Sequence, residues 1–475
     1  MVTLAAVLLG AGLDAGAVPI DEPQVGGIGF SGPTTGDVAA IYWNPAALAL
    51  IEGPELTVSG NLRLTTTTAT LKDPTTGAAY PSARSSDFSH PALWPPWPPG
   101  PGTFAGLAYN VGGDRFTLGV AMYLPFAERT SYELPAPPAA PTNPVHFHRI
   151  TADLRDLALV PALAVRLAGD LRFGVAPGLL FSTGQLSFDQ PTDDTRYALD
   201  SGQGLGSARF AVTLGLGLYY RRRTWELGIS FSSRPWGGDV TGASVVGASN
   251  VAITRPGSAS GNAPVVTCAG HPDGSGCVYA EMISKLPYTL TAGAAWHPRP
   301  GLELSAMARL LSFPADDVID IRLTGVNLPS FGVPEHIVLY RGYGTVLDAR
   351  VRAARWITKR LHLGVGLRFE TGALSASAVS PATVDGNQLE PTAMVAFQPL
   401  KHLFIGAGYG FTFLLPVTTT GSVFDPGFAT RCASSGHDLG SADCAAANQG
   451  RARPSADGTY GRVTQTFSLS VTTQF

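Results

Sequence analysis

Hydrophobic and polar residues alternate along most of this chain after residue 54, in stretches that glycine- and proline-rich segments separate. In the clearest stretch, residues 209–221, every second residue is a large apolar one. A period of two places successive side chains on opposite faces of a β-strand. The pattern predicts about fourteen strands with one apolar face each, at residues 55–71, 104–111, 115–124, 156–167, 171–188, 209–221, 224–232, 286–297, 301–313, 342–357, 361–372, 388–397, 402–415 and 460–475.

The connections between these strands alternate between long segments and short turns, for example the turns at 112–114, 168–170 and 358–360. This asymmetry and an even strand number are typical of outer-membrane barrels, whose periplasmic turns are short and whose extracellular loops are long. The fold class predicted is all-β, a transmembrane antiparallel β-barrel. Because unpaired backbone groups are costly in hydrocarbon, such a barrel has to close.

A soluble β-sandwich is the alternative fold for the same alternation. Against it stands the charge on the less apolar faces, where Asp348, Arg350 and Arg352 lie on one strand and Arg368 and Glu370 on the next. These groups would be costly in a sandwich core, whereas a barrel lumen accommodates them. The apolar faces lack central charges, as lipid contact requires.

The segment at 26–51 precedes the strands and has a different pattern. It is apolar enough to be buried, but its glycines, its two prolines and the single charge of Asp37 are incompatible with one long helix. We interpret it as a small irregular plug. A barrel of fourteen strands has room for it in the lumen.

The tail of this segment, Trp43-Asn44-Pro45-Ala46-Ala47-Leu48, resembles the N-terminal hatch of the FadL/TodX family of outer-membrane transporters of hydrophobic compounds. The strand pair at 160–181, VPALAVRLAGDLRFGVAPGLLF, is similar to the corresponding hairpin of these barrels. By itself, the short motif is also compatible with an Asn-Pro turn and a short apolar helix in a soluble protein.

The resemblance implies passive uptake of hydrophobic molecules, with long-chain fatty acids as first choice and aromatic hydrocarbons as the alternative. It implies capture at extracellular loops, here 187–207 and 233–285, a lumen pocket beside the hatch, and lateral release into the membrane as the hatch shifts. It divides the chain into a signal-peptide remnant (1–17), a hatch (18–52) and a barrel (53–475). The expected gate residues are Trp43, Asn44, Pro45 and Ala46.

Two features bear on the lumen and its wall. The arginines Arg350, Arg352 and Arg368 can meet a ligand carboxylate, or they can form a structural ladder with neighbouring acidic residues. Pro161 and Pro177 lie inside predicted strands and predict a bulge or a broken ladder, with a possible side opening. The resemblance places the wall kink elsewhere, in the third strand at 115–124.

Composition narrows the class of protein. The chain has 475 residues, 56 glycines, 38 prolines and only 14% charged residues, which disfavours both a disordered and a helical protein. The net charge of -3, without a basic block, gives no case for nucleic-acid binding.

Residues 2–13 resemble the apolar core of a signal peptide without its basic flank, and we expect export with cleavage near Ala17.

The cysteines form two close pairs, Cys268 with Cys277 and Cys432 with Cys444, each in a loop-like segment. Their even number and location predict two disulfides in an oxidising compartment. A four-cysteine metal site is the alternative, but the spacings lack the tight knuckles of zinc ligands.

Two other classes of function remain as alternatives. A barrel enzyme is suggested only by His146, His148 and Asp153 before a strand. No nucleophile motif accompanies them, and a solvated loop is the preferred interpretation. The other class is a structural or adhesive barrel. We expect a non-enzymatic monomer in outer-membrane lipid, with a hydrophobic small molecule as its partner and no cofactor.

Overall fold

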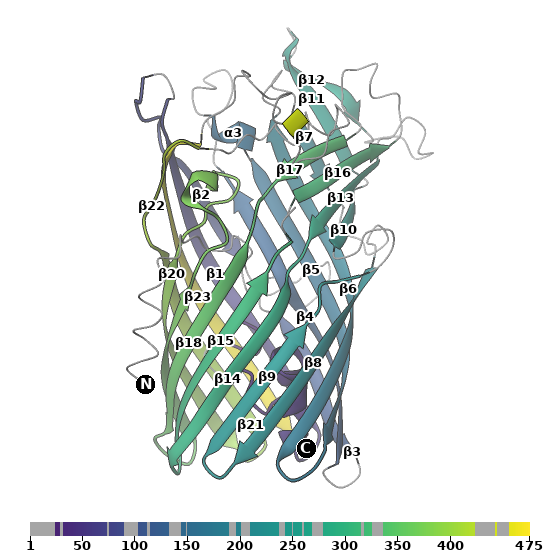
Figure 1. The fold of residues 1–475 in the computed structure, drawn as a ribbon, viewed down its shortest axis with the longest axis vertical. Coiled ribbons are helices and arrows are strands. Elements are labelled where there is room, and N and C mark those ends of the chain that lie inside the picture. The colour runs from purple at the N-terminus through teal and green to yellow at the C-terminus, as the bar shows by residue number, and fades with distance from the viewer. Residues whose placement is uncertain are drawn as a thin grey trace.

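The computed structural model describes residues 24–28, 32–73, 76–89, 103–111, 115–132, 144–148, 150–189, 196–200, 210–236, 243–248, 250–258, 261–267, 279–314, 318–324, 336–422, 442–443 and 456–475. It is a closed antiparallel barrel of 14 strands (Figure 1). The barrel strands are β1 (Glu55–Leu71), β3 (Phe104–Val111), β4 (Phe116–Ser131), β5 (Thr151–Arg166), β6 (Leu171–Asp189), β8 (Phe210–Arg222), β9 (Trp225–Ser232), β14 (Tyr288–Arg299), β15 (Leu302–Ser312), β18 (Thr345–Trp356), β19 (Leu361–Glu370), β20 (Gln388–Leu400), β21 (Leu403–Leu414) and β23 (Gly458–Gln474).

Closure is made by the first and last strands. β1 pairs with β23 over its whole length, from Glu55 opposite Gln474 to Leu71 opposite Gly458. Every barrel strand therefore has two neighbours, so the barrel leaves no open edge to lipid. The predicted fold is confirmed, and the predicted bounds of β1 and β3 agree with the structure.

The apolar faces point outward, as the alternation predicts. On β8, Phe210, Leu218 and Tyr220 are exposed, while Ala211 and Tyr219 between them are buried on the lumen side. Leu227 and Ile229 continue this outer face on β9. Large apolar side chains exposed over so much of the surface match a lipid-facing band.

Aromatic residues gather where the strands reach the short turns. Trp225 stacks on Trp296 with ring centroids 5.6 Å apart, and Trp356 stacks on His362 at 4.7 Å. Aromatic girdles of this kind lie at the headgroup level of membrane barrels. Among the residues that the structure describes, no helix is both long and apolar enough to cross a membrane.

The long connections contain more regular structure than the sequence pattern predicts. A separate sheet is formed by β10 (Ala243–Ala248), β13 (Tyr279–Lys285), β16 (Val318–Thr324) and β17 (His336–Tyr340). Further elements are β2 (Ala83–Ser89), α3 (Val145–His148), β7 (Arg196–Asp200), β11 (Asn250–Ser258), β12 (Gly261–Thr267), η4 (Ala376–Ala378) and β22 (Val417–Thr419). Figure 1 shows most of them gathered at one end of the barrel, opposite the short turns.

The predicted end of one strand at residue 124 and the predicted start of the next at residue 156 are both wrong. β4 continues to Ser131 past Pro125, with a register shift between Tyr123 and Phe126, and β5 already begins at Thr151. Proline has no amide donor, but it is tolerated at a bulge, where ladder pairing is already interrupted. A proline within an alternating pattern therefore does not reliably mark the end of a strand.

The interruption predicted at Pro161 and Pro177 is also present. β5 and β6 pair from Thr151 opposite Ser187 to Leu159 opposite Leu179, and again from Leu163 opposite Val175 onward. The register is the same on both sides, so the ladder is broken without a bulge.

Candidate functional site: the barrel lumen

The N-terminal residues that the structure describes lie inside the barrel, where Figure 1 shows their short helix between the walls. Gly26 and Gly27 have φ of 84° and 97°, a left-handed conformation that glycine adopts without strain. Two short helices follow, α2 (Ala40–Trp43) and η1 (Pro45–Leu50). We call residues 24–28 and 32–51 the inner segment. Its helices are as short and irregular as the sequence predicts.

Asn44 connects the inner segment to the wall. Its Nδ2 donates to the carbonyl of Pro33 at 2.8 Å and to the carbonyl of Leu218 on β8 at 3.0 Å. Its Oδ1 accepts from the backbone N–H of Ala46 at 3.2 Å and so caps η1. Asn44 is fully buried, so each of these bonds replaces a hydrogen bond to water.

Glycines in the wall admit the next residues of the motif. A Cβ at Gly174 would lie 2.2 Å from the backbone N of Ala46, and one at Gly217 would lie 2.1 Å from Oδ1 of Asn44. The backbone of the inner segment thus touches the backbone of β6 and β8 directly. Close approach of this kind requires glycine on the wall.

Trp43 is held on three sides. Its Nε1 donates to the carbonyl of Val25 at 2.9 Å, and its own carbonyl accepts from Oγ of Ser230 at 2.5 Å. The guanidinium carbons of Arg350 and Arg309 lie 5.1 and 5.6 Å from its ring centroid. These are cation–π distances, so Trp43 joins the inner segment to the charged part of the wall.

The charged wall is a ladder across β18, β19 and β20. Asp348 is fully buried and pairs with Nη2 of Arg350 at 2.6 Å and with Nε of Arg368 at 3.2 Å. Arg368 also pairs with Glu390 at 3.1 Å and with Glu370. Each guanidinium in this cluster therefore has a carboxylate partner, which offsets the cost of burying both.

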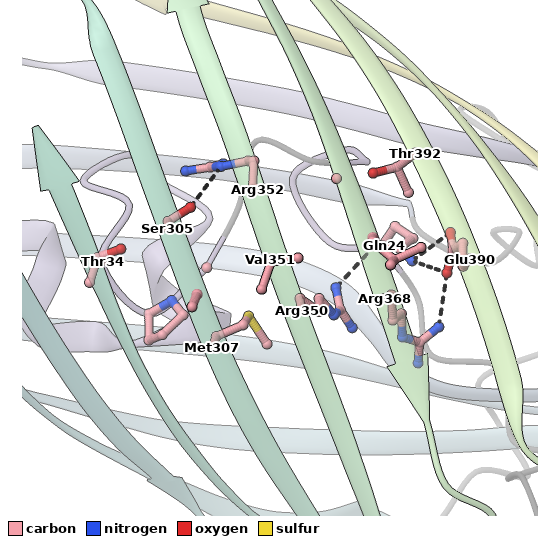
Figure 2. Close-up of a pocket in the computed structure, with 15 residues that line it drawn as sticks. Gln24, Thr34, Ser305, Met307, Arg350, Val351, Arg352, Arg368, Glu390 and Thr392 are labelled. Carbon is pink, nitrogen blue, oxygen red and sulfur yellow. Dashed lines mark hydrogen bonds and ion pairs between the residues drawn. The ribbon is translucent and has the colours of Figure 1, made fainter. Parts of the chain in front are cut away.

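The inner segment takes part in this ladder through Gln24. The Nη1 of Arg350 donates to Oε1 of Gln24 at 3.3 Å, and Nε2 of Gln24 donates to Glu390 at 3.4 Å (Figure 2). Arg352 lies apart from this cluster and pairs with Glu303 and, at 3.0 Å, with Oγ of Ser305. Figure 2 shows a pocket between these side chains and the Pro33 region of the inner segment.

A second, less charged pocket lies on the side of the inner segment that faces the long loops. Tyr42, Trp43 and Pro45 form its floor, and residues of seven strands, β4, β5, β6, β8, β9, β14 and β15, form its walls. Among the described residues that line it, the only charged one is Arg309, whose guanidinium also lies over the rings of Tyr42 and Trp43. We call this space the upper pocket. Its lining suits an apolar molecule with one polar end.

Of the predicted lumen residues, Trp43, Asn44, Pro45 and Ala46 belong to the inner segment, and Arg350 contacts it through Trp43 and Gln24. Arg368 pairs with Glu390, which accepts from Gln24, and Arg352 pairs with Glu303 and lines the same pocket. Sequence reasoning missed Gln24, Arg309, Ser230, Glu303 and Glu390. The signal for Arg309, Glu303 and Glu390 was available, because each is a charge at a lumen position of an alternating strand.

Other predicted features lie elsewhere. All four cysteines, the segment 1–23 and much of the expected capture loops fall outside the described residues. The solvated loop expected for His148 and Asp153 is wrong, because His148 is buried in α3 and Asp153 pairs on β5 with Arg155 at 2.6 Å. Among the described residues, no group of three or more His, Cys, Asp and Glu is arranged to hold a metal.

The barrel is closed, its apolar faces point outward, and the inner segment lies in its lumen. Together these features define a plugged outer-membrane β-barrel. Residues 7–214 match the family described as "Outer membrane protein transport protein (OMPP1/FadL/TodX)". No match was found among curated proteins.

Solved structures extend the similarity to the whole barrel. A Pseudomonas aeruginosa FadL homologue is 13% identical with a TM-score of 0.67, covering 97% of this chain and 100% of that one. The P. putida toluene transporter TodX is 15% identical (TM-score 0.63, 95% and 97%), and the Ralstonia pickettii toluene transporter TbuX is 12% identical (TM-score 0.58, 95% and 99%). At these identities the likeness shows the fold. Residues 7–214 are thus similar in sequence to the FadL/TodX family model, and the whole barrel is similar in fold to the FadL and TodX structures.

Proposed function

We propose that this barrel carries hydrophobic molecules passively across the outer membrane, with long-chain fatty acids as the first choice of substrate. The observation that carries the proposal is the upper pocket, which is mostly apolar and floored by Trp43 and Pro45. Arg309 is the single charged residue among the described residues that line it. A carboxylate beside this guanidinium and a chain along the apolar walls would match that lining.

Aromatic hydrocarbons are the second candidate, because Tyr42, Trp43, Tyr123 and Phe126 supply aromatic surface to the same pocket. The two substrates make different demands on Arg309. Arg309→Met removes the positive charge and retains an apolar side chain. It is expected to weaken oleate binding about ten-fold and to leave toluene binding unchanged.

In this proposal the inner segment acts as a hatch that has to shift before the substrate leaves the pocket. Asn44 and Pro45 fix its position, so the double variant Asn44→Ala/Pro45→Ala is expected to change uptake in cells while the barrel still assembles. Normal uptake by the assembled double variant would contradict the hatch mechanism.

The test of transport itself is mass spectrometry of small molecules extracted from the folded, detergent-purified barrel, beside a variant lacking residues 18–52. Fatty acids or hydrocarbons retained by the full chain and lost from the variant would support a pocket bordered by the hatch. The absence of a specific ligand from both folded barrels would favour a structural role instead.

A further inference from the structure

The lipid-facing side of the wall has a hollow over β14, β15 and β18, which face the viewer in Figure 1. Outward positions here carry alanine, where those of β8 carry large apolar side chains. The strand register aligns Ala292, Ala308 and Ala349 in one row, and Ala294 with Ala306 in the next. We call this the alanine hollow. The larger apolar side chains around it are Leu227, Ile229, Val351, Leu367 and Phe369.

The alanine hollow is a depression in the outer surface, and the wall behind it is closed. At this height the ladders from β9 through β14, β15 and β18 to β19 continue without a register shift. On the lumen side the inner segment packs against the wall, since a Cβ at Gly293 would lie 2.7 Å from Cγ of Pro33. The hollow has a volume of about 660 Å³. A molecule that occupies it therefore comes from the membrane.

Exposed basic side chains lie below the alanine hollow, at the short turns of the same strands and their neighbours. They are Arg222 and Arg223 at the β8–β9 turn, Arg299 at the β14–β15 turn, and Arg355, Lys359 and Arg360 at the β18–β19 turn. Among the residues that the structure describes, none of these six has an ion-pair partner. Glu226 and Glu303, the acidic residues nearest in sequence to Arg223 and Arg299, pair instead with Arg221 and Arg352. We call the six residues the basic rim.

One lipid molecule can reach from the basic rim to the alanine hollow. Arg355 and Val351 share a face of β18 and are four residues apart, with Ala353 between them. At about 3.3 Å per residue this is about 13 Å along the strand, or about 10 Å of depth for a strand tilted by about 40°. Half of the hydrocarbon core is about 15 Å thick, so the hollow lies where acyl chains of the nearer leaflet reach. Trp225 and Trp296 stack beside this path.

We propose that the alanine hollow and the basic rim form a binding site for one anionic phospholipid of the periplasmic leaflet. The short turns mark the periplasmic end of the barrel, and that leaflet is made of phospholipid. The arginines of the basic rim donate to the phosphate, and one acyl chain fills the alanine hollow. Charge selects this occupant, because a basic patch at the membrane surface attracts an anionic headgroup. The inference goes beyond transport, since the ligand is a resident lipid on the outer wall.

The experiment is native mass spectrometry of the folded full chain in detergent, with dioleoylphosphatidylglycerol or dioleoylphosphatidylcholine added. The unmodified barrel is expected to retain one phosphatidylglycerol molecule and to bind it about ten-fold more tightly than phosphatidylcholine. Ala294→Phe/Ala306→Phe fills the hollow and is expected to weaken the binding of both lipids about ten-fold. Arg222→Gln/Arg299→Gln/Arg355→Gln is expected to abolish the preference for phosphatidylglycerol, because it removes half of the charge of the basic rim.

Two controls lie elsewhere on the same barrel. Ala393 is an exposed alanine on β20, opposite Val365 and Tyr409 and outside the hollow, and Lys401 is an exposed charge at the β20–β21 turn. Ala393→Phe and Lys401→Gln are expected to bind phosphatidylglycerol as the unmodified barrel does.

Three results would overturn the proposal. Equal lipid retention by Ala294→Phe/Ala306→Phe and Ala393→Phe would show that the bound lipid belongs to the general lipid shell. An unmodified barrel that binds the two lipids equally, or a triple arginine variant that still prefers phosphatidylglycerol, would show that the basic rim does not recognise the headgroup. None of the substituted residues lines the upper pocket, so the outcome is independent of oleate or toluene transport.

Discussion

At the scale of single residues, the lumen is shaped by contacts that a single methyl group would disturb. Gly215 and Gly217 follow each other on the lumen face of β8. A Cβ at Gly217 would lie 2.1 Å from Oδ1 of Asn44, whereas one at Gly215 would come no nearer than 3.3 Å to Ala176. The two positions therefore test whether direct contact with the wall holds the inner segment in place.

Gly217→Ala is expected to displace the inner segment and to expose it to protease, because the added methyl cannot coexist with the Asn44 side chain. Gly215→Ala is the control and is expected to retain the cleavage pattern of the unmodified barrel. Both variants should still fold, which is checked on gels by the difference in migration between unheated and heated samples of a folded barrel. Equal protease resistance of the two variants would show that β8 does not position Asn44.

Asp385 is a buried carboxyl in the connection between β19 and β20. Burial, the largest effect, raises its pKa to about 8; Glu370 also raises it, while Arg462 and the amides of Leu374 and Ala373 lower it. Its Oδ2 accepts from these two amides at 2.9 and 3.1 Å. A folded-state pKa above the unfolded one means that protonation favours the folded connection.

The contribution of Asp385 to stability is therefore complete at low pH and is lost as the pH rises through about 8. We expect the hydrogen-exchange protection of the Ala373 and Leu374 amides, corrected for intrinsic exchange, to fall as the pH rises through about 8. Asp385→Asn cannot ionise and should show no such fall. A fall of the same size in the variant would assign the effect to another group.

At the scale of elements, the ladder on β18, β19 and β20 is a structural unit to which the inner segment is attached. Asp348 bridges Arg350 and Arg368, and Gln24 bridges Arg350 and Glu390. The arginines considered for ligand binding thus have carboxylate partners already. This favours the structural interpretation of the ladder over a direct role in binding.

Asp348→Ala is expected to destabilise the folded barrel by about 3 kcal/mol, because it removes the fully buried carboxylate that the guanidinium groups of Arg350 and Arg368 share. The measurement is the thermal unfolding midpoint in detergent. Asp153→Ala is the control, since Asp153 pairs with Arg155 at a less buried position and should cost less. An equal shift for both variants would argue against a special role of the buried ladder.

The strands and the direction of their faces were predictable because period two is a local signal that lipid contact enforces on every strand. The bounds of β1 and β3 agree with the structure for this reason. The separate sheet of β10, β13, β16 and β17 was not predictable from alternation, because its strands are short and their pairing is non-local. The same holds for Gln24, because the partners of its side chain are more than 300 residues away.

At the scale of the whole molecule, the arrangement is a barrel whose lumen is occupied rather than open. The inner segment is anchored on both sides, by Asn44 to β8 and by Gln24 to the charge ladder. Its hydrophobic cluster with the wall includes Val38, Ile41, Trp43 and Leu48. A route for water-soluble ions therefore requires that this segment leave.

This arrangement predicts how the barrel conducts ions in a planar lipid bilayer. The full chain is expected to give little current, whereas a variant lacking residues 18–52 is expected to form a steady open channel, because a lumen of 14 strands without a filling is wide enough for hydrated ions. Gly217→Ala should fall between them, with brief openings as the displaced segment moves. A large steady current through the full chain would mean that ions bypass the inner segment, and it would contradict the occlusion of the lumen by this segment.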